Sequence, residues 1–183
     1  MTRSASQPLY LRPVRESELD LVEALYDDPV EASEYGFYGY RNPGGLRRSW
    51  AEPDGIIGLD RGSLVVVRTG GPAEEETVVG EVGWHKVVHG PTSFCWNIGI
   101  GLFAKERGKG YGTEAQRLLA RYLFAHTQVN RVEAATESSN IGEQRALEKA
   151  GFTREGVERG SCFRMGHWRD MVVYSILRSE VTL

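Results

Sequence analysis

Residues 102–112, which read Leu-Phe-Ala-Lys-Glu-Arg-Gly-Lys-Gly-Tyr-Gly, constrain most strongly what this chain can fold into. They separate a strand-like run at residues 94–102 from a helical pattern of apolar residues that begins at Ala115. Three glycines at alternate positions allow a tight turn and keep side chains away from an approaching ligand. Free N–H groups in the first turn of the following helix, with the helix dipole, attract anions. The segment therefore predicts a cradle for a diphosphate.

Arg107 and Lys109 add positive charge to this loop, and its spacing narrows the class of phosphate ligand. A Walker loop requires Gly-x4-Gly-Lys-Ser/Thr, whereas Lys109 is followed by Gly110 and Tyr111. A dinucleotide fingerprint requires Gly-x-Gly-x-x-Gly at the start of a βαβ unit, and here the glycines alternate after a predicted meander. The spacing therefore disfavours an ATP- or NAD-dependent enzyme. A glycine-rich turn without a ligand stays open as the alternative.

Hydrophobic periodicity divides the remaining chain into short strands and helices, which we interpret as one domain over residues 1–183. Strands are predicted at residues 9–14, 64–67, 78–88, 94–102, 132–136, 153–163 and 168–177. One helix is predicted after a cap at Ser17, with a stripe of Leu21, Val22, Leu25 and Tyr26 before Pro29, and others at residues 115–123 and 143–150. Turns at residues 69–76 and 89–91 make an antiparallel meander, and Met165 and Gly166 join the last two strands. The pattern predicts a mixed α/β (α+β) fold.

Residues 36–62 are rich in glycine and aromatic side chains and have little core periodicity. Two interpretations stay open for them. They either fold over a ligand on the substrate side of the protein or form a surface excursion with a short helix near residues 46–50.

Composition disfavours several classes of protein. The formal net charge of −3 argues weakly against a dedicated nucleic-acid binder, and no apolar run approaches the length of a membrane span. Residues 1–8 lack the apolar block of a secretory signal. Cys95 and Cys162 lack metal-ligand spacing, so we expect reduced thiols in a cytoplasmic protein and no metal.

Several segments, taken in order, resemble a known family. Arg107-Gly-Lys-Gly-Tyr-Gly112 matches the Arg/Gln-x-x-Gly-x-Gly/Ala signature of the GNAT superfamily of N-acetyltransferases. Further matches are Leu11-Arg-Pro13, Asn140, Leu147-Glu-Lys-Ala-Gly-Phe152, Glu155-Gly156, Trp168-Arg-Asp170 and Tyr174-Ser-Ile-Leu177. This set is similar to the Rim-type branch, which acetylates the N-termini of ribosomal proteins.

The resemblance implies a mostly antiparallel sheet of six or seven strands flanked by helices. The strand that ends at Leu102 and the strand at Val132 would run parallel and splay apart at a bulge, with the pantetheine arm of acetyl-CoA in the gap. The implied cofactor-binding residues are Ile100, Leu102, Arg107, Gly108, Lys109, Gly110, Tyr111, Gly112, Thr113 and Asn140.

The implied reaction moves an acetyl group directly from acetyl-CoA to a primary amine, either a protein N-terminus or a small amine. A homodimer is compatible with the resemblance. Neither a nucleic acid nor a membrane is expected as a partner. The alternative is a CoA-binding module without efficient catalysis, because Asn97 and Leu147 replace a glutamate and a tyrosine that relatives use.

The catalytic residues are less constrained than the loop. Glu81 and His85 share one face of a predicted strand and are candidates for the base that deprotonates the amine. Glu133 and Glu143 are further candidates, and Glu143 stands where relatives often have a serine. Each of these residues also has a plain structural interpretation as a solvated or helix-stabilising charge.

Overall fold

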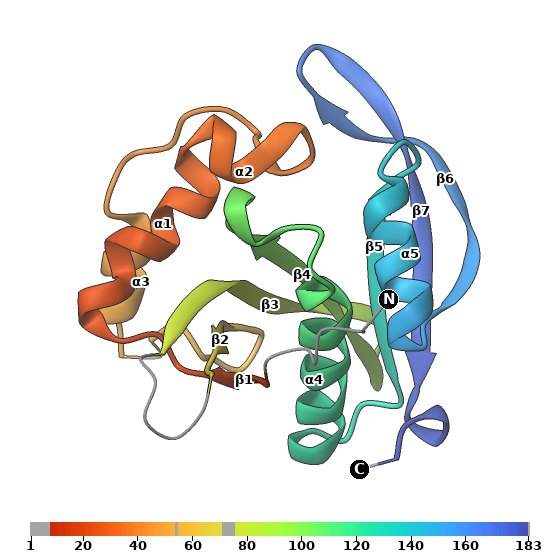
Figure 1. The fold of residues 1–183 in the computed structure, drawn as a ribbon. Coiled ribbons are helices and arrows are strands. Elements are labelled where there is room, and N and C mark those ends of the chain that lie inside the picture. Colours follow the sequence, from red (N-terminus) through yellow and green to blue (C-terminus); the bar gives the residue numbers. More distant parts are fainter. Residues whose placement is uncertain (1–7, 54, 71–75, 183) are drawn as a thin grey trace, which may run out of the picture.

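The computed structural model describes residues 8–53, 55–70 and 76–182, and Figure 1 shows one sheet with helices around it. Its strands are β1 (Leu9–Arg12), β2 (Arg61–Arg68), β3 (Thr77–Gly90), β4 (Ser93–Leu102), β5 (Arg131–Glu137), β6 (Thr153–Arg164) and β7 (His167–Leu177). Its helices are α1 (Leu19–Asp27), α2 (Pro29–Gly36), α3 (Gly45–Ala51), α4 (Tyr111–His126) and α5 (Ile141–Ala150). Residues 1–7, on which the expectation about a signal rests, and most of the predicted turn at 69–76 lie outside the described residues.

The seven strands form one sheet in the order β1-β2-β3-β4-β5-β7-β6. All neighbours are antiparallel except β4 and β5, which pair in parallel from Trp96 opposite Val132 to Ile98 opposite Ala134. Beyond those pairs β4 continues to Leu102 and β5 to Glu137 without pairing to each other. The predicted mixed sheet and its splayed parallel pair are therefore confirmed.

The bulge expected at this splay is wrong. The register between β3 and β4 is continuous from Val88 opposite Phe94 to Gly80 opposite Leu102, and its irregularity lies at the other end, between Val88 and Gly90. The gap arises where pairing to β5 stops, so the strands can diverge through ordinary sheet twist without an extra residue.

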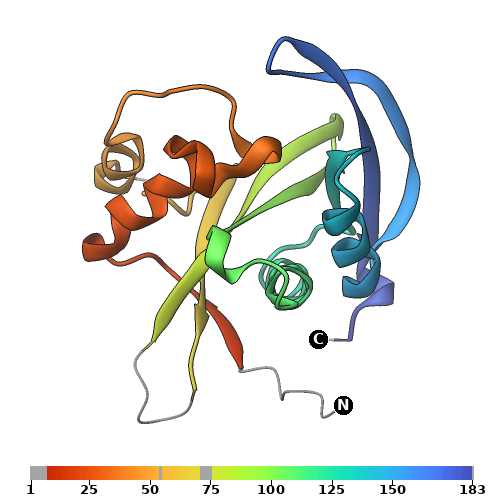
Figure 2. The ribbon, with the colours of Figure 1, turned by 45° about the horizontal axis from the view of Figure 1, so that its top comes forward.

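Two hydrophobic cores lie on opposite faces of the sheet. Leu64 and Val66 of β2 belong to the core with Leu119 and Leu123 of α4, to which Leu147 of α5 also belongs. The alternate residues Val65 and Val67 pack with Val22 and Leu25 of α1. Figure 2 looks along α4 and shows α1–α3 on one side of it and α5 with β6–β7 on the other. In the described ranges, no helix combines the length and apolarity needed to cross a bilayer.

The first helices differ from the prediction. Ser17 lies in a 3-10 turn (Glu16–Glu18), and α1 begins one residue after that turn, with Leu19 buried and Leu21 47% exposed. The predicted cap and one residue of the apolar stripe are therefore wrong. The first helix does end before Pro29, at Asp27, and Pro29 then starts α2 with Asp28 as the cap. Proline suits the first position of a helix, where its missing N–H has no intrahelical partner.

Three further local predictions have mixed outcomes. The hairpin between β6 and β7 turns at Met165 and Gly166, whose φ angles of 50° and 78° fit a primed hairpin turn. The short helix near residues 46–50 is present as α3. The turn predicted at residues 89–91 starts too early, because β3 runs through His89 to Gly90.

Candidate active site

A cleft of about 1350 Å³ lies where β4 and β5 part. It runs between the segment from α1 to β2, the strands of the splay, the glycine loop and the start of α5. The predicted cofactor residues that line it are Ile100, Leu102, Arg107, Gly108, Gly110, Gly112, Thr113 and Asn140. Lys109 and Tyr111 are absent from its lining.

The glycine loop presents bare backbone to this cleft. Gly108 and Gly110 have φ angles of +74° and +85°, and a Cβ added at either would meet no atom within 4 Å. Gly110 precedes α4 and no side chain caps that helix, so first-turn N–H groups are left without a side-chain partner. Left-handed glycines before an uncapped helix start form a concave set of donors suited to an anion.

The cationic residues of the loop are partly engaged by the protein. Arg107 donates from Nε to the Leu102 carbonyl at 3.0 Å and also donates to the Glu31 carbonyl, so it ties the loop to β4 and α2. Lys109 Nζ lies 3.0 Å from the buried Glu106 carboxylate, which offsets part of its charge. The positive potential of the loop therefore comes from its backbone amides, from the dipole of the helix that follows it, and from Arg107 and Lys109, whose charges are partly engaged by the protein.

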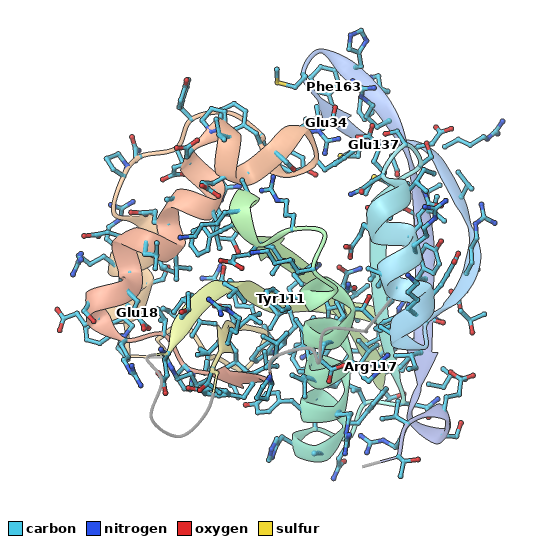
Figure 3. All side chains as sticks on the ribbon, viewed as in Figure 1. Glu18, Glu34, Tyr111, Arg117, Glu137 and Phe163 are labelled. Atoms are coloured by element: carbon cyan, nitrogen blue, oxygen red, sulfur yellow. The ribbon has the colours of Figure 1, made fainter. Side chains whose placement is uncertain are left out.

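Tyr111 belongs to the glycine loop, but its side chain packs into the hydrophobic core. It is 9% exposed and packs in the core on the α4 face of the sheet. Figure 3 labels it at the start of α4, beside the loop. Its role as a cofactor-contacting residue stays a prediction, whereas its packing is plain from the structure.

Asn140 and Glu143 lie together at the start of α5 and both border the cleft. The Asn140 side chain accepts a hydrogen bond from the Glu143 backbone N–H at 3.2 Å and so caps the helix. Burial raises the pKa of Glu143 to about 7, and an interaction with Gln116 opposes the shift. Glu143 therefore changes protonation state near neutral pH while it faces the cleft.

The raised pKa of Glu143 predicts a pH-dependent effect on stability. The wild-type protein loses stability as pH rises from the unfolded value near 4.5 through about 7, because folding then has to bury a charge. Glu143→Gln removes that cost and is expected to be more stable than wild type at pH 8, by roughly 1–3 kcal/mol, with little difference at pH 4.5. Urea unfolding at both pH values measures this. Glu158→Gln, an exposed carboxylate on β6, is the control and is expected to change little at either pH.

The two strand candidates for a base have different surroundings. Glu81 is 4% exposed, accepts a hydrogen bond from the Tyr26 hydroxyl and does not line the cleft. Burial raises the pKa of the Glu81 carboxyl. His85 is exposed, lines the cleft and stands opposite Asn97, next to the point where β4 and β5 part. The structure thus brings His85 to the splay and places Glu81 behind Tyr26.

Glu133, the remaining candidate, belongs to a different cluster. Its Oε2 accepts hydrogen bonds from Arg131 at 3.2 Å, and His89, Cys95 and Glu133 place ligand-type atoms within 4.8 Å of one another. Sequence spacing did not reveal this group, because the three residues come from three strands. The Arg131 guanidinium on the shared carboxylate opposes a cation there, and burial raises the pKa of the Cys95 thiol to about 11.

A buried ion pair also lines the cleft, and the sequence did not predict it. Arg164 and Glu137 are paired with side chains only 4% and 6% exposed. Arg164 also donates to the Tyr35 carbonyl at 2.6 Å and lies 5.5 Å from the centre of the Tyr38 ring. Figure 3 labels Glu137 in the upper part of the molecule. The pair therefore fastens the end of α2 to β5 and β6.

Known proteins resemble this chain in both sequence and structure. The Acetyltransferase (GNAT) domain family matches residues 8–153. The probable N-acetyltransferase YjcK of Bacillus subtilis is 35% identical over 108 residues, which cover 59% of this chain and 59% of YjcK. The chain therefore spans less than two thirds of that relative.

Two solved structures share the whole fold. Spermidine N-acetyltransferase from Vibrio cholerae, in complex with CoA and spermine, has a TM-score of 0.79 at 19% identity and covers 94% of this chain and 96% of its own. RimJ from Mycobacterium smegmatis, in complex with CoA-disulfide, has a TM-score of 0.74 at 21% identity and covers 97% of this chain and 86% of its own. At these identities both comparisons establish the fold.

Proposed function

Because the chain belongs to the acetyltransferase (GNAT) family, we propose that it is an enzyme that transfers an acetyl group directly from acetyl-CoA to a primary amine. The observation that carries the proposal is the cleft at the parted β4 and β5 strands, with the glycine loop at one end. The glycine loop exposes backbone donors that suit the pyrophosphate of CoA, and the unpaired edge of β4 suits its pantetheine arm.

In this proposal the pyrophosphate of acetyl-CoA binds the amides of residues 108–113. The pantetheine arm lies along β4 beyond Ile98, where pairing with β5 has ended. The Leu102 carbonyl already accepts a hydrogen bond from Arg107, so Ile100 offers the freer backbone contact. A backbone N–H of this stretch would polarise the thioester carbonyl.

The chemistry rests mainly on holding two substrates together, which can remove roughly 7–11 kcal/mol of barrier. We assign His85 as the group that accepts the proton of the amine, directly or through water, because it is exposed in the cleft beside the splay. Glu143, with a pKa of about 7, is poised to return a proton to the departing CoA thiolate. Leu147 cannot serve as an acid, and it is fully buried.

Release of CoA thiol tests the function directly. Purified protein with acetyl-CoA and a panel of primary amines is expected to release thiol in step with amine acetylation, measured by mass spectrometry. His85→Ala is expected to lower kcat about 100-fold or more, as loss of a general base does, with acetyl-CoA affinity unchanged. Lys86→Ala, the neighbouring substitution on β3, is the control for local disturbance of the strand.

A CoA-binding module without catalysis gives a different result. It would bind acetyl-CoA tightly in calorimetry and yet acetylate no amine of the panel at any pH up to 9. Thiol release without an acetylated amine would point to hydrolysis and would also contradict the proposal.

A further inference from the structure

The face of the sheet beside the splay has a floor without large side chains. Cross-strand register puts Ser63, Gly83 and Gly99 in one row over β2, β3 and β4. A Cβ added at Gly99 would meet no atom within 4 Å, and all three residues line the cleft. Because side chains on one strand face repeat every second residue, the rows on either side of this one form its walls.

An arginine side chain lies at each of the two rows that flank this floor. On one side Arg61 stands opposite His85, which stands opposite Asn97. On the other side Tyr26 covers Glu81, and the Arg41 guanidinium lies 5.8 Å from the centre of the Tyr26 ring. Both arginines are exposed and line the cleft.

Neither arginine has an acidic partner. Among the described residues, no carboxylate lies within ion-pair distance of Arg41 or Arg61. Asp60, the neighbour of Arg61, pairs with Lys86 at 3.1 Å. This end of the cleft therefore has cations without counter-ions.

Three of the carboxylates that border the cleft or its floor are already engaged. Tyr26 donates to Glu81, and the Ala104 N–H donates to Glu31 at 2.7 Å. Glu137 is paired with Arg164. Glu34 of α2 is exposed and borders the cleft, and Glu143 borders it from the start of α5. In the part of the cleft that the structure describes, Arg41 and Arg61 therefore contribute positive charge that no ion pair offsets, in spite of the overall charge of −3.

We propose that the acceptor amine belongs to a molecule that also carries a carboxylate, which Arg61 binds with support from Arg41. The inference rests on the proposed acetyl transfer, since it assigns the acceptor of that same site. Guanidinium groups form strong, directed hydrogen bonds with carboxylates, and the bare floor lets a small acceptor lie between them. A polyamine or another polycation would meet two arginines that no described carboxylate pairs with.

Dipeptide amides that share a free N-terminal alanine and differ only in the second side chain test this assignment. Ala-Glu-NH2 is expected to have a kcat/KM about tenfold or more above Ala-Gln-NH2, the gain of one hydrogen bond between charged groups. Ala-Lys-NH2 and spermidine are expected to be poorer than Ala-Gln-NH2. Acetyl-CoA consumption and product mass are measured for each.

Variants of the two arginines show whether they cause the preference for the glutamate-containing dipeptide. Arg61→Gln is expected to bring the Glu-to-Gln ratio of kcat/KM close to one, mainly by raising KM for Ala-Glu-NH2, with acetyl-CoA affinity retained. Arg159→Gln, an exposed arginine on β6 outside the cleft, is expected to keep the full ratio. A ratio that survives Arg61→Gln and the Arg41→Gln, Arg61→Gln double variant would overturn the assignment.

The outcomes separate this inference from the function on which it rests. Efficient turnover of spermidine or Ala-Lys-NH2 over Ala-Glu-NH2 would refute the carboxylate-bearing acceptor and leave the acetyltransferase intact. Failure to acetylate any amine would refute both.

Discussion

Gly110→Val is expected to weaken acetyl-CoA binding by about 100-fold or more. Gly110 has a φ angle of +85°, which a β-branched residue adopts only at a cost of roughly 1–2 kcal/mol, so the loop would shift. The added side chain would also project toward the cleft, where the structure leaves the position open. Both effects remove backbone donors from the pyrophosphate. Isothermal calorimetry with CoA and acetyl-CoA measures the change.

Gly166→Val is the matched control for that loss. Gly166 has a φ angle of +78° and likewise has no atom within 4 Å of an added Cβ, but it lies in the β6–β7 turn outside the cleft. It should carry a similar backbone cost in folding while CoA affinity stays within about twofold of wild type. Equal losses of affinity in both variants would show that Gly110→Val acts through general destabilisation.

Arg164→Met is expected to lower the free energy of unfolding by about 3–5 kcal/mol, the usual result of leaving a buried charge without its partner. Glu137 and Arg164 are both almost fully buried, and Arg164 also holds the Tyr35 carbonyl. Arg169 lies 3.8 Å from the Glu137 carboxylate, too far for a strong hydrogen bond, so it replaces little of the lost pair. Urea denaturation followed by circular dichroism measures the loss.

The double variant Glu137→Gln, Arg164→Met distinguishes the unpaired charge from lost packing. It is expected to recover part of the stability, because the remaining amide needs no counter-ion. Arg47→Met breaks the exposed pair with Asp20 and is expected to leave the unfolding curve unchanged. If Arg164→Met unfolded at the same urea concentration as wild type, the pair would not fasten α2 to the sheet.

The features that depend on local sequence could be predicted. Alternating glycines between a strand pattern and a helix pattern specify the loop at residues 107–112, and the structure has left-handed backbone at Gly108 and Gly110. Periodicity located each strand and both long C-terminal helices within a few residues. The parallel pairing of β4 and β5 came from the resemblance to a family rather than from periodicity, which does not specify the direction of pairing.

The features that depend on long-range register could not be predicted. Alternation puts Glu81 and His85 on one face, but only the packing of α1 shows that Tyr26 covers Glu81 and leaves His85 in the cleft. The pairing of Arg164 with Glu137 joins residues 27 positions apart, and no local pattern marks it. That no described carboxylate pairs with Arg61 likewise emerges only from the packed structure, in which Asp60 pairs with Lys86 instead.

A crystal structure of the protein with acetyl-CoA tests the central claim most directly. The pyrophosphate oxygens should lie within hydrogen-bond distance of the backbone amides of residues 108–113, with the thioester beside β4 at the point where it leaves β5. A cofactor bound elsewhere, with those amides facing only solvent, would contradict the assignment of both the loop and the reaction.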